Sequence, residues 1–443
     1  MNPPRPESRG ADDVPTAARI SHASWAVFLV FTLNGFAFAS WASRLPTVRD
    51  ALDLEPNQMG LLLLFSAIGS ILALPLAGLV VDRLGSRRAV ETFAGVAAVG
   101  LLVVALSVAQ ESVGLARVGL FVAGVGIGVW DASMNLQGAH VEQQLGRAIM
   151  PRFHAGFSFG TVAGAGFGAL FAALHVPVPL HLTIAVAVAV VGVLLAVRLF
   201  LPDPAHEHEH EPEPARAADD TTCDPADSFP APAAAAQGTG ARRRRALQAW
   251  TEPRTLLIGL VVLGAALTEG AANDWVSLAT VDGFDTSDSI GAVALGVFLV
   301  AMTAMRLLGT GLLDRFGRIT VLRALAASAL LGVLAFALLP HLVGALVGVA
   351  LWGMGAALGF PVGISAASDD PRRAAARVSV VTTIGYSAFF VGPPLIGFIA
   401  HHVGYRHALL FVGIPIALGL VVMNAVRPLP GAVGQGTKPA TAP

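Results

Sequence analysis

Long apolar runs separated by short polar turns occupy most of the 443-residue chain. A helix needs about 20 mostly apolar residues to cross the hydrocarbon core of a membrane. Because the runs are continuous rather than alternating, they predict an all-α membrane protein and argue against a membrane β-barrel. Twelve spans are predicted, at 23–43, 58–81, 88–109, 113–136, 152–174, 178–200, 254–280, 289–312, 319–339, 342–366, 376–400 and 405–426.

The polar segments divide these spans into two sets of six. The predicted organisation is an N-terminal cytoplasmic tail, a six-helix half, a linker, a second six-helix half and a C-terminal tail, at 1–22, 23–200, 201–253, 254–426 and 427–443. The linker is rich in Pro, Asp, Glu, Ala and His, so it has too little apolar surface to fold and is predicted to be disordered.

Composition narrows the class of protein. The chain is 55% hydrophobic and 13% charged, whereas a soluble domain carries roughly 25% charged residues. A formal net charge of −1 gives no field that would favour nucleic acid. The single Cys223 excludes an intrachain disulfide and a multi-cysteine metal site. Neither a phosphate-binding Gly-rich loop nor a zinc-protease or nucleophile-elbow motif occurs, so we expect no enzyme, no ATP drive, no metal and no other cofactor.

Arginine placement predicts the orientation in the membrane. With both termini on the cytoplasmic side, the short cytoplasmic loops hold eleven arginines and the opposite loops hold three. This is the bias expected of cytoplasmic loops. Arg242 to Arg245 of the linker lie on the same side and are expected to contact anionic lipid. His206, His208 and His210 alternate with glutamates, either as a weak metal site or, preferably, as a solvated tract.

One short motif occurs twice, 232 residues apart (314 − 82). Each copy follows one apolar run and precedes another, which predicts a tight polar turn between antiparallel helices. Further matches at an offset of 229 pair 156–158 with 385–387, so the two halves are related by duplication. The two turns comprise Gly78, Asp82, Arg83, Gly85, Arg87 and Arg88 in the first copy and Gly311, Asp314, Arg315, Gly317 and Arg318 in the second.

These features resemble the major facilitator superfamily, whose members have twelve helices in two halves, a long central loop and the turn motif G-x-x-x-D-R-x-G-R-R. The segment from Asp131 to Gly138, followed by 146–158, is similar to inner-membrane carriers related to the fucose–proton symporters. The resemblance implies alternating access, proton coupling, location in the bacterial inner membrane and action as a monomer on a small-molecule substrate. It also implies that the turn latches the halves together on the cytoplasmic side of the outward-open state.

One departure concerns the fifth span. Many drug–proton antiporters carry G-x-x-x-G-P-x-x-G-G there, but this chain has Ala165 at the proline position and Ala169 at the last glycine. These two residues argue against a drug or metabolite exporter, which is the alternative to a symporter. A membrane sensor or scaffold without transport activity is a third possibility.

Acids within apolar spans are the candidates for proton coupling, because an ionised group inside a membrane normally faces a partner or a water-filled space. Asp131 lies in the fourth span and Glu269 in the seventh. Asp131 either handles protons or substrate or forms a structural salt bridge. Asn135, one turn further, either orients Asp131, bonds a solute hydroxyl or joins two helices. Arg306 in the eighth span needs an acid partner, and either acid could serve.

The remaining candidates belong to a substrate site or a proton relay. Asn273 shares a helix face with Glu269 and, with Trp275, would suit a sugar-like solute. Trp275 is alternatively an interface residue, where Trp is enriched. Asn34 aligns with Glu269 at an offset of 235. His154 is either a proton relay or an interfacial histidine.

Overall fold

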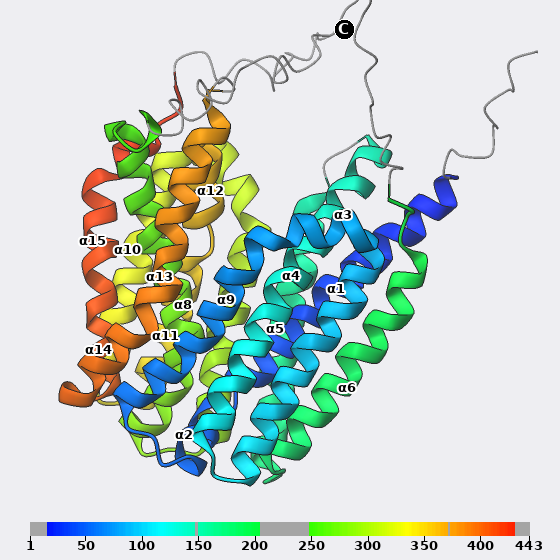
Figure 1. Ribbon diagram of the computed structural model, residues 1–443. Helices are drawn as coiled ribbons and strands as arrows, with labels where there is room; N and C mark the ends of the chain where they lie inside the picture. Colours follow the sequence, from blue (N-terminus) through cyan, green and yellow to red (C-terminus); the bar gives the residue numbers. More distant parts are fainter. Residues whose placement is uncertain (1–15, 147–148, 204–247, 371–372, 430–443) are drawn as a thin grey trace, which may run out of the picture.

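The computed structural model describes residues 16–146, 149–203, 248–370 and 373–429, and every regular element within them is a helix. The predictions for the linker, its His–Glu tract and Arg242 to Arg245 lie outside the described residues, as do Cys223 and most of both tails. Figure 1 shows the helices before the linker and those after it as two neighbouring bundles.

The first bundle, called here the N-half, begins several of its helices with a proline in the first turn, where the missing N–H costs no helical hydrogen bond. Its elements are α1 (Ala17–Ala42), α2 (Leu45–Ala51), α3 (Pro56–Ala109), α4 (Val113–Leu145), α5 (Met150–Ala173), α6 (Val178–Ala196) and η1 (Val197–Leu199).

The second bundle, called here the C-half, starts with Pro253 in the same way. Its elements are α8 (Pro253–Phe284), α9 (Asp288–Phe316), α10 (Arg318–Leu338), α11 (Leu342–Ala356), α12 (Gly359–Ala367), α13 (Ala374–Val403), α14 (Tyr405–Ala408), η2 (Leu409–Val412), α15 (Gly413–Val422) and η3 (Met423–Val426).

Helix α3 contains two spans rather than one. Its 54 residues are interrupted by non-helical backbone at Gly85, with φ 79° and ψ 156°. Along α4, the contacts with the first part of α3 advance from Ser66 to Ser70, whereas those with the second part recede from Val104 to Ala97. The chain therefore reverses direction at Gly85. Within the described residues, eleven segments are long and apolar enough to cross a membrane, and counting α3 twice gives the predicted twelve spans.

The tenth span is broken, which the hydropathy pattern does not predict. Helix α11 ends at Ala356, and α12 starts at Gly359. The break falls in a glycine-rich stretch, 353–359. It leaves the carbonyl of Ala357 available to a side chain of another helix.

The halves meet through α3 against α13 and α5 against α9. A Cβ atom at Gly60 would lie 2.5 Å from the Pro393 carbonyl oxygen, and one at Gly397 would lie 2.6 Å from the Pro56 carbonyl oxygen. These glycines permit the two backbones to approach, as small residues commonly do between membrane helices.

Side chains also join the halves at the end of the bundle that carries α2, called here the α2 end. The guanidinium of Arg49 is 2.7 Å from the carboxylate of Asp282 and lies over the Tyr405 ring. Thr47 donates a hydrogen bond to Asp288, on the first turn of α9. The other end, where α6 ends and α8 begins, is called here the linker end. The halves are thus tied together at the α2 end.

Candidate solute and proton site

Asp131 lies on α4 with its side chain partly exposed. Among the described residues no hydrogen bond or ion pair reaches its carboxylate. Asn135 donates through Nδ2 to the backbone carbonyl oxygen of Asp131, at 2.8 Å, so its amide does not orient the carboxyl group. A carboxylate without a counter-charge is costly inside a membrane span. Asp131 is therefore chemically suited to exchange a proton.

Glu269 and Arg306 form an ion pair between α8 and α9. Nη2 of Arg306 is 2.9 Å from Oε2 of Glu269, and both side chains are largely buried, with 28% and 21% exposure. Nε of Arg306 donates to the free carbonyl of Ala357, at 3.2 Å. The pair thus joins three elements, α8, α9 and the break between α11 and α12. Of the two candidate partners for Arg306, the structure selects Glu269.

Two further side chains face this region from opposite halves. Tyr386 on α13 is 44% exposed and close enough to Asp131 for their charges to interact. His154 on α5 is exposed and packs its ring edge-on against Phe31, with the ring centroids 5.3 Å apart. It is also close enough to Arg306 for an electrostatic interaction. Asp131, His154, Glu269, Arg306 and Tyr386 are called here the central polar group, because members of the two halves lie within range of each other's charge.

The other predicted solute residues are buried in this conformation. Asn34 is 3% exposed within the N-half, with its Nδ2 3.8 Å from the sulfur of Met134. Trp275 is fully buried and packs its ring against Tyr405, with a centroid distance of 5.7 Å. Its indole is covered in this conformation, which favours the packing alternative. Asn273 is 9% exposed, and its Oδ1 has no partner among the described residues.

The first predicted turn is held by a carboxylate from the end of the N-half. Asp203 accepts hydrogen bonds from the backbone N–H of Ser86, at 2.8 Å, and from its hydroxyl. A Cβ atom at Gly85 would lie 2.7 Å from the same carboxylate, so glycine is required both for the backbone angle and for this approach. Asp82, Arg83 and the neighbouring Arg87 and Arg88 are exposed, with Arg87 paired to Glu91.

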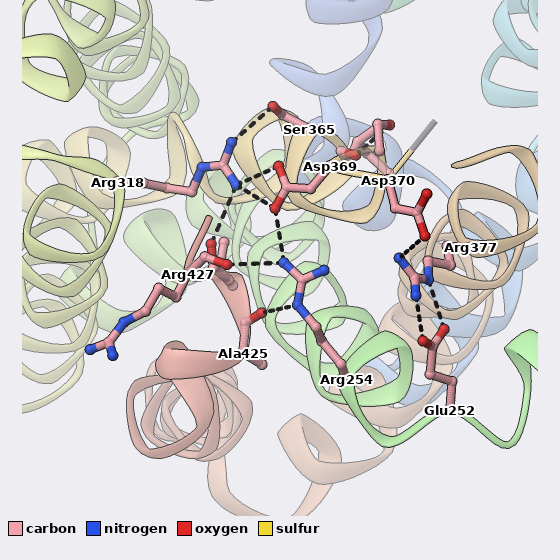
Figure 2. A network of polar contacts seen from close by, with 12 residues as sticks. Glu252, Arg254, Arg318, Ser365, Asp369, Asp370, Arg377, Ala425 and Arg427 are labelled. Carbon is pink, nitrogen blue, oxygen red and sulfur yellow. Dashed lines mark hydrogen bonds and ion pairs between the residues drawn. The ribbon is translucent and has the colours of Figure 1, made fainter. Parts of the chain in front are cut away.

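The second turn has the same backbone and a different set of contacts. Gly317 has φ 78° and ψ 157°. The next residue, Arg318, donates to both carboxylate oxygens of Asp369, at 3.1 and 3.3 Å. Arg254 donates to the same carboxylate at 2.8 Å. Figure 2 shows the two guanidinium groups converging on Asp369, so this turn is tied by charge to the starts of α8 and α10 and the end of α12.

A second ion pair lies beside this network. Arg377 donates to both oxygens of Glu252, with its Nε at 2.7 Å (Figure 2). These hydrogen bonds, together with one from Thr255 and the charge of Arg373, hold the pKa of the Glu252 carboxyl below its usual value despite partial burial. Glu252 precedes the first residue of α8, so the pair fixes the point where the chain enters the C-half.

Several of these residues were not predicted from the sequence. Asp203, Arg254 and Asp369 lie at helix ends far apart in the chain, and no short motif marks them. Tyr386 has one signal, since it occupies the repeat position that Phe157 holds in the N-half. A phenol at a position that is otherwise Phe suggests contact with a polar group.

Comparisons with known proteins agree with this architecture. The family model of the Major Facilitator Superfamily matches residues 24–393. An uncharacterised MFS-type transporter of Yersinia pestis is 31% identical over 375 residues, covering 84% of this chain and 87% of its own length. The membrane protein MosC of Rhizobium meliloti is 28% identical over 402 residues, covering 90% and 88%.

Solved structures share the fold at low sequence identity. A mutant of the nucleoside transporter NupG superposes with a TM-score of 0.70 at 14% identity, covering 91% of this chain and 99% of its own. The E. coli fucose:proton symporter FucP, as a mutant, superposes with a TM-score of 0.59 at 17% identity, covering 91% and 98%. The family match spans most of the twelve-helix core, and the protein is thus a multi-pass membrane transporter that belongs to the Major Facilitator Superfamily.

Proposed function

We propose that the protein is a proton-coupled symporter of a small polar solute. The observation that carries the proposal is the difference between its two central acids. Glu269 is neutralised by Arg306 at 2.9 Å, whereas no counter-charge among the described residues reaches Asp131. A carboxyl group in this setting can bind a proton in one conformation and release it in another, since its surroundings change when the halves move.

Alternating access supplies the movement. The ties at the α2 end join the halves through Arg49 and Asp282 and through Glu55 and His401, at 2.7 and 3.5 Å. The arginine bias supports a cytoplasmic position for the linker end and for both termini. With this orientation the conformation described is closed towards the periplasm and is the state from which solute and proton leave to the cytoplasm.

The comparisons with known proteins support the kind of solute and the membrane. The related proteins of known organism are bacterial, which supports the inner membrane as the location. FucP is described as a fucose:proton symporter and NupG as a nucleoside transporter, and both fit a small polar solute. The central polar group offers carboxylates and a phenol that could bond solute hydroxyls.

Uptake into proteoliposomes tests the proposal. The purified protein is first screened by thermal shift against sugars, nucleosides, organic acids and drugs. The solute that stabilises it is then offered outside vesicles with a more acidic external buffer. We expect accumulation above the external concentration, abolished by a protonophore. Accumulation only when the interior is the more acidic side would indicate that solute and protons move in opposite directions, as in an exporter. Equilibration of the solute without accumulation would contradict proton coupling.

A further inference from the structure

The C-half presents two aromatic rings beside the central polar group. Phe360 on α12 and Tyr386 on α13 are stacked, with centroids 5.9 Å apart and planes inclined by 29°. Tyr386 is 44% exposed, and Phe360 is partly buried. These two rings are called here the aromatic platform. The exposed part of Tyr386 leaves aromatic surface available to a ligand.

The backbone at Gly385 makes room for the Phe360 ring beside α13. A Cβ atom at Gly385 would lie 3.3 Å from the Phe360 ring, so the absence of a side chain there allows the ring to lie against α13. The break in the tenth span lies three residues before Phe360, and Arg306 holds that break through the Ala357 carbonyl at 3.2 Å. The ion pair with Glu269 thus also positions the platform.

Carboxyl groups of both halves lie in the same region as the platform. Tyr386 is within electrostatic reach of Asp131 on the opposite half. Glu269 uses Oε2 for Arg306, and Oε1 has no partner among the described residues. Two carboxyl groups suit a ligand that donates several hydroxyl groups. Because the charge of Arg306 is balanced by Glu269, and Asp131 adds a second acid, the acids and the arginine of the central polar group give no net positive charge that would favour an anionic ligand.

We infer that the transported solute is a neutral, hydroxylated ring, which lays its apolar face on the exposed ring of Tyr386, backed by Phe360, and directs its hydroxyls to Asp131 and Glu269. The inference rests on the proposed transport function and adds the class of substrate. Two kinds of solute share this chemistry, a pyranose sugar and a ribonucleoside. The aromatic surface predicted at Trp275 is thereby supplied by Tyr386 and Phe360, because Trp275 is fully buried.

Pairs of matched solutes measure how much the flat face of a ring solute contributes to its affinity. D-Glucose, D-galactose and D-mannose are each compared with the corresponding open-chain alditol, which keeps the hydroxyls and lacks the ring. Uridine is compared with D-ribose, which lacks the base. Binding to the purified full-length protein is measured by calorimetry in detergent, without a proton gradient. We expect at least one ring solute to bind about tenfold more tightly than its partner.

Variants then assign that preference to the platform. Tyr386→Leu should remove most of the preference for the ring solute, whereas Tyr386→Phe should keep it. Phe398→Leu is the matched control, because Phe398 is on the same helix, is 59% exposed and contacts His402 instead of the central polar group. Thermal unfolding of each variant verifies that the fold is intact.

The outcomes separate this inference from the transport proposal. Equal affinity for ring and open-chain partners, binding by none of the ring solutes, or a ring preference that survives in Tyr386→Leu would each overturn the platform. A ring preference lost in Tyr386→Leu and kept in Phe398→Leu supports it, even for a protein that shows no proton-driven uptake. Preference within the sugar pairs or within the uridine pair tells which of the two solutes is used.

Discussion

The two halves of the molecule share the backbone of one turn and differ in how their charges are neutralised. The turns at Gly85 and Gly317 agree within one degree in φ and ψ. In the N-half the central acid, Asp131, has no counter-charge among the described residues, and the turn is closed by Asp203 on backbone and hydroxyl groups. In the C-half, ion pairs neutralise the central acid, Glu269, and close the turn.

The difference suggests a division of labour after duplication. The ion pairs of the C-half, Glu269–Arg306 at the centre and Arg318–Asp369 at the turn, fix helices relative to one another. An acid without a fixed partner, such as Asp131, is free to change its protonation when its surroundings change. We therefore expect the N-half to carry the proton and the C-half to carry most of the solute contacts.

The largest effect is expected from Asp131→Asn, which mimics the neutral carboxyl group. The variant should lose uphill accumulation completely and keep solute exchange between the two sides of the vesicle, because exchange needs no net proton transfer. Parallel measurements of accumulation and counterflow in the same proteoliposomes check this. Uphill uptake at the wild-type rate in Asp131→Asn would show that Asp131, like Glu269, does not carry the coupled proton.

Glu269→Gln should weaken solute binding about tenfold or more, because a lost hydrogen bond to a charged group costs roughly 1.5–3 kcal/mol. The change also leaves Arg306 without its acid, so a loss of thermal stability is expected. The double variant Glu269→Gln, Arg306→Gln should recover stability without recovering affinity. Calorimetry and thermal unfolding measure the two quantities separately, and unchanged affinity in the single variant would assign the pair to packing alone.

The two turns allow a direct comparison of halves. If the first turn latches the cytoplasmic side in the outward-open state, Asp82→Asn should shift the population a few-fold towards inward-open, a change of about 1 kcal/mol. Asp314→Asn should shift it less, because Arg318, Asp369 and Arg254 tie the second turn within its own half. Labelling of single cysteines on the two faces reports the population. Equal labelling in wild type and Asp82→Asn would show that the first turn sets topology only.

The smallest effect concerns the Glu252–Arg377 pair. Since the pKa of Glu252 is lowered by Arg377 in the folded protein, its contribution is fully present above the ordinary value of 4.5 and is lost as pH falls below it. The free energy of unfolding, measured by thermal unfolding, should therefore be about 1 kcal/mol higher for wild type than for Glu252→Gln near neutral pH. The two should converge as the pH falls through the lowered pKa of Glu252. A constant difference at all pH values would show that the carboxylate charge is not responsible.

Hydropathy predicted the spans because a membrane helix must satisfy its backbone internally and cover itself with apolar side chains. It did not predict the break at Ala357, where a glycine-rich stretch and the Arg306 side chain replace helical hydrogen bonds. Spacing placed Asn273 and Glu269 on one face of α8, but it could not show that Trp275 is covered by Tyr405. Burial of that kind depends on contacts between helices 130 residues apart (405 − 275).

The pH dependence of solute binding tests the division of labour most directly. In wild type the affinity for the solute should rise as the pH falls, because solute and proton favour the same state of a symporter and each raises the affinity for the other. Asp131→Asn should bind with an affinity that no longer changes with pH, whereas Glu269→Gln should bind more weakly and keep the pH dependence. A pH dependence that persists in Asp131→Asn and disappears in Glu269→Gln would contradict the account.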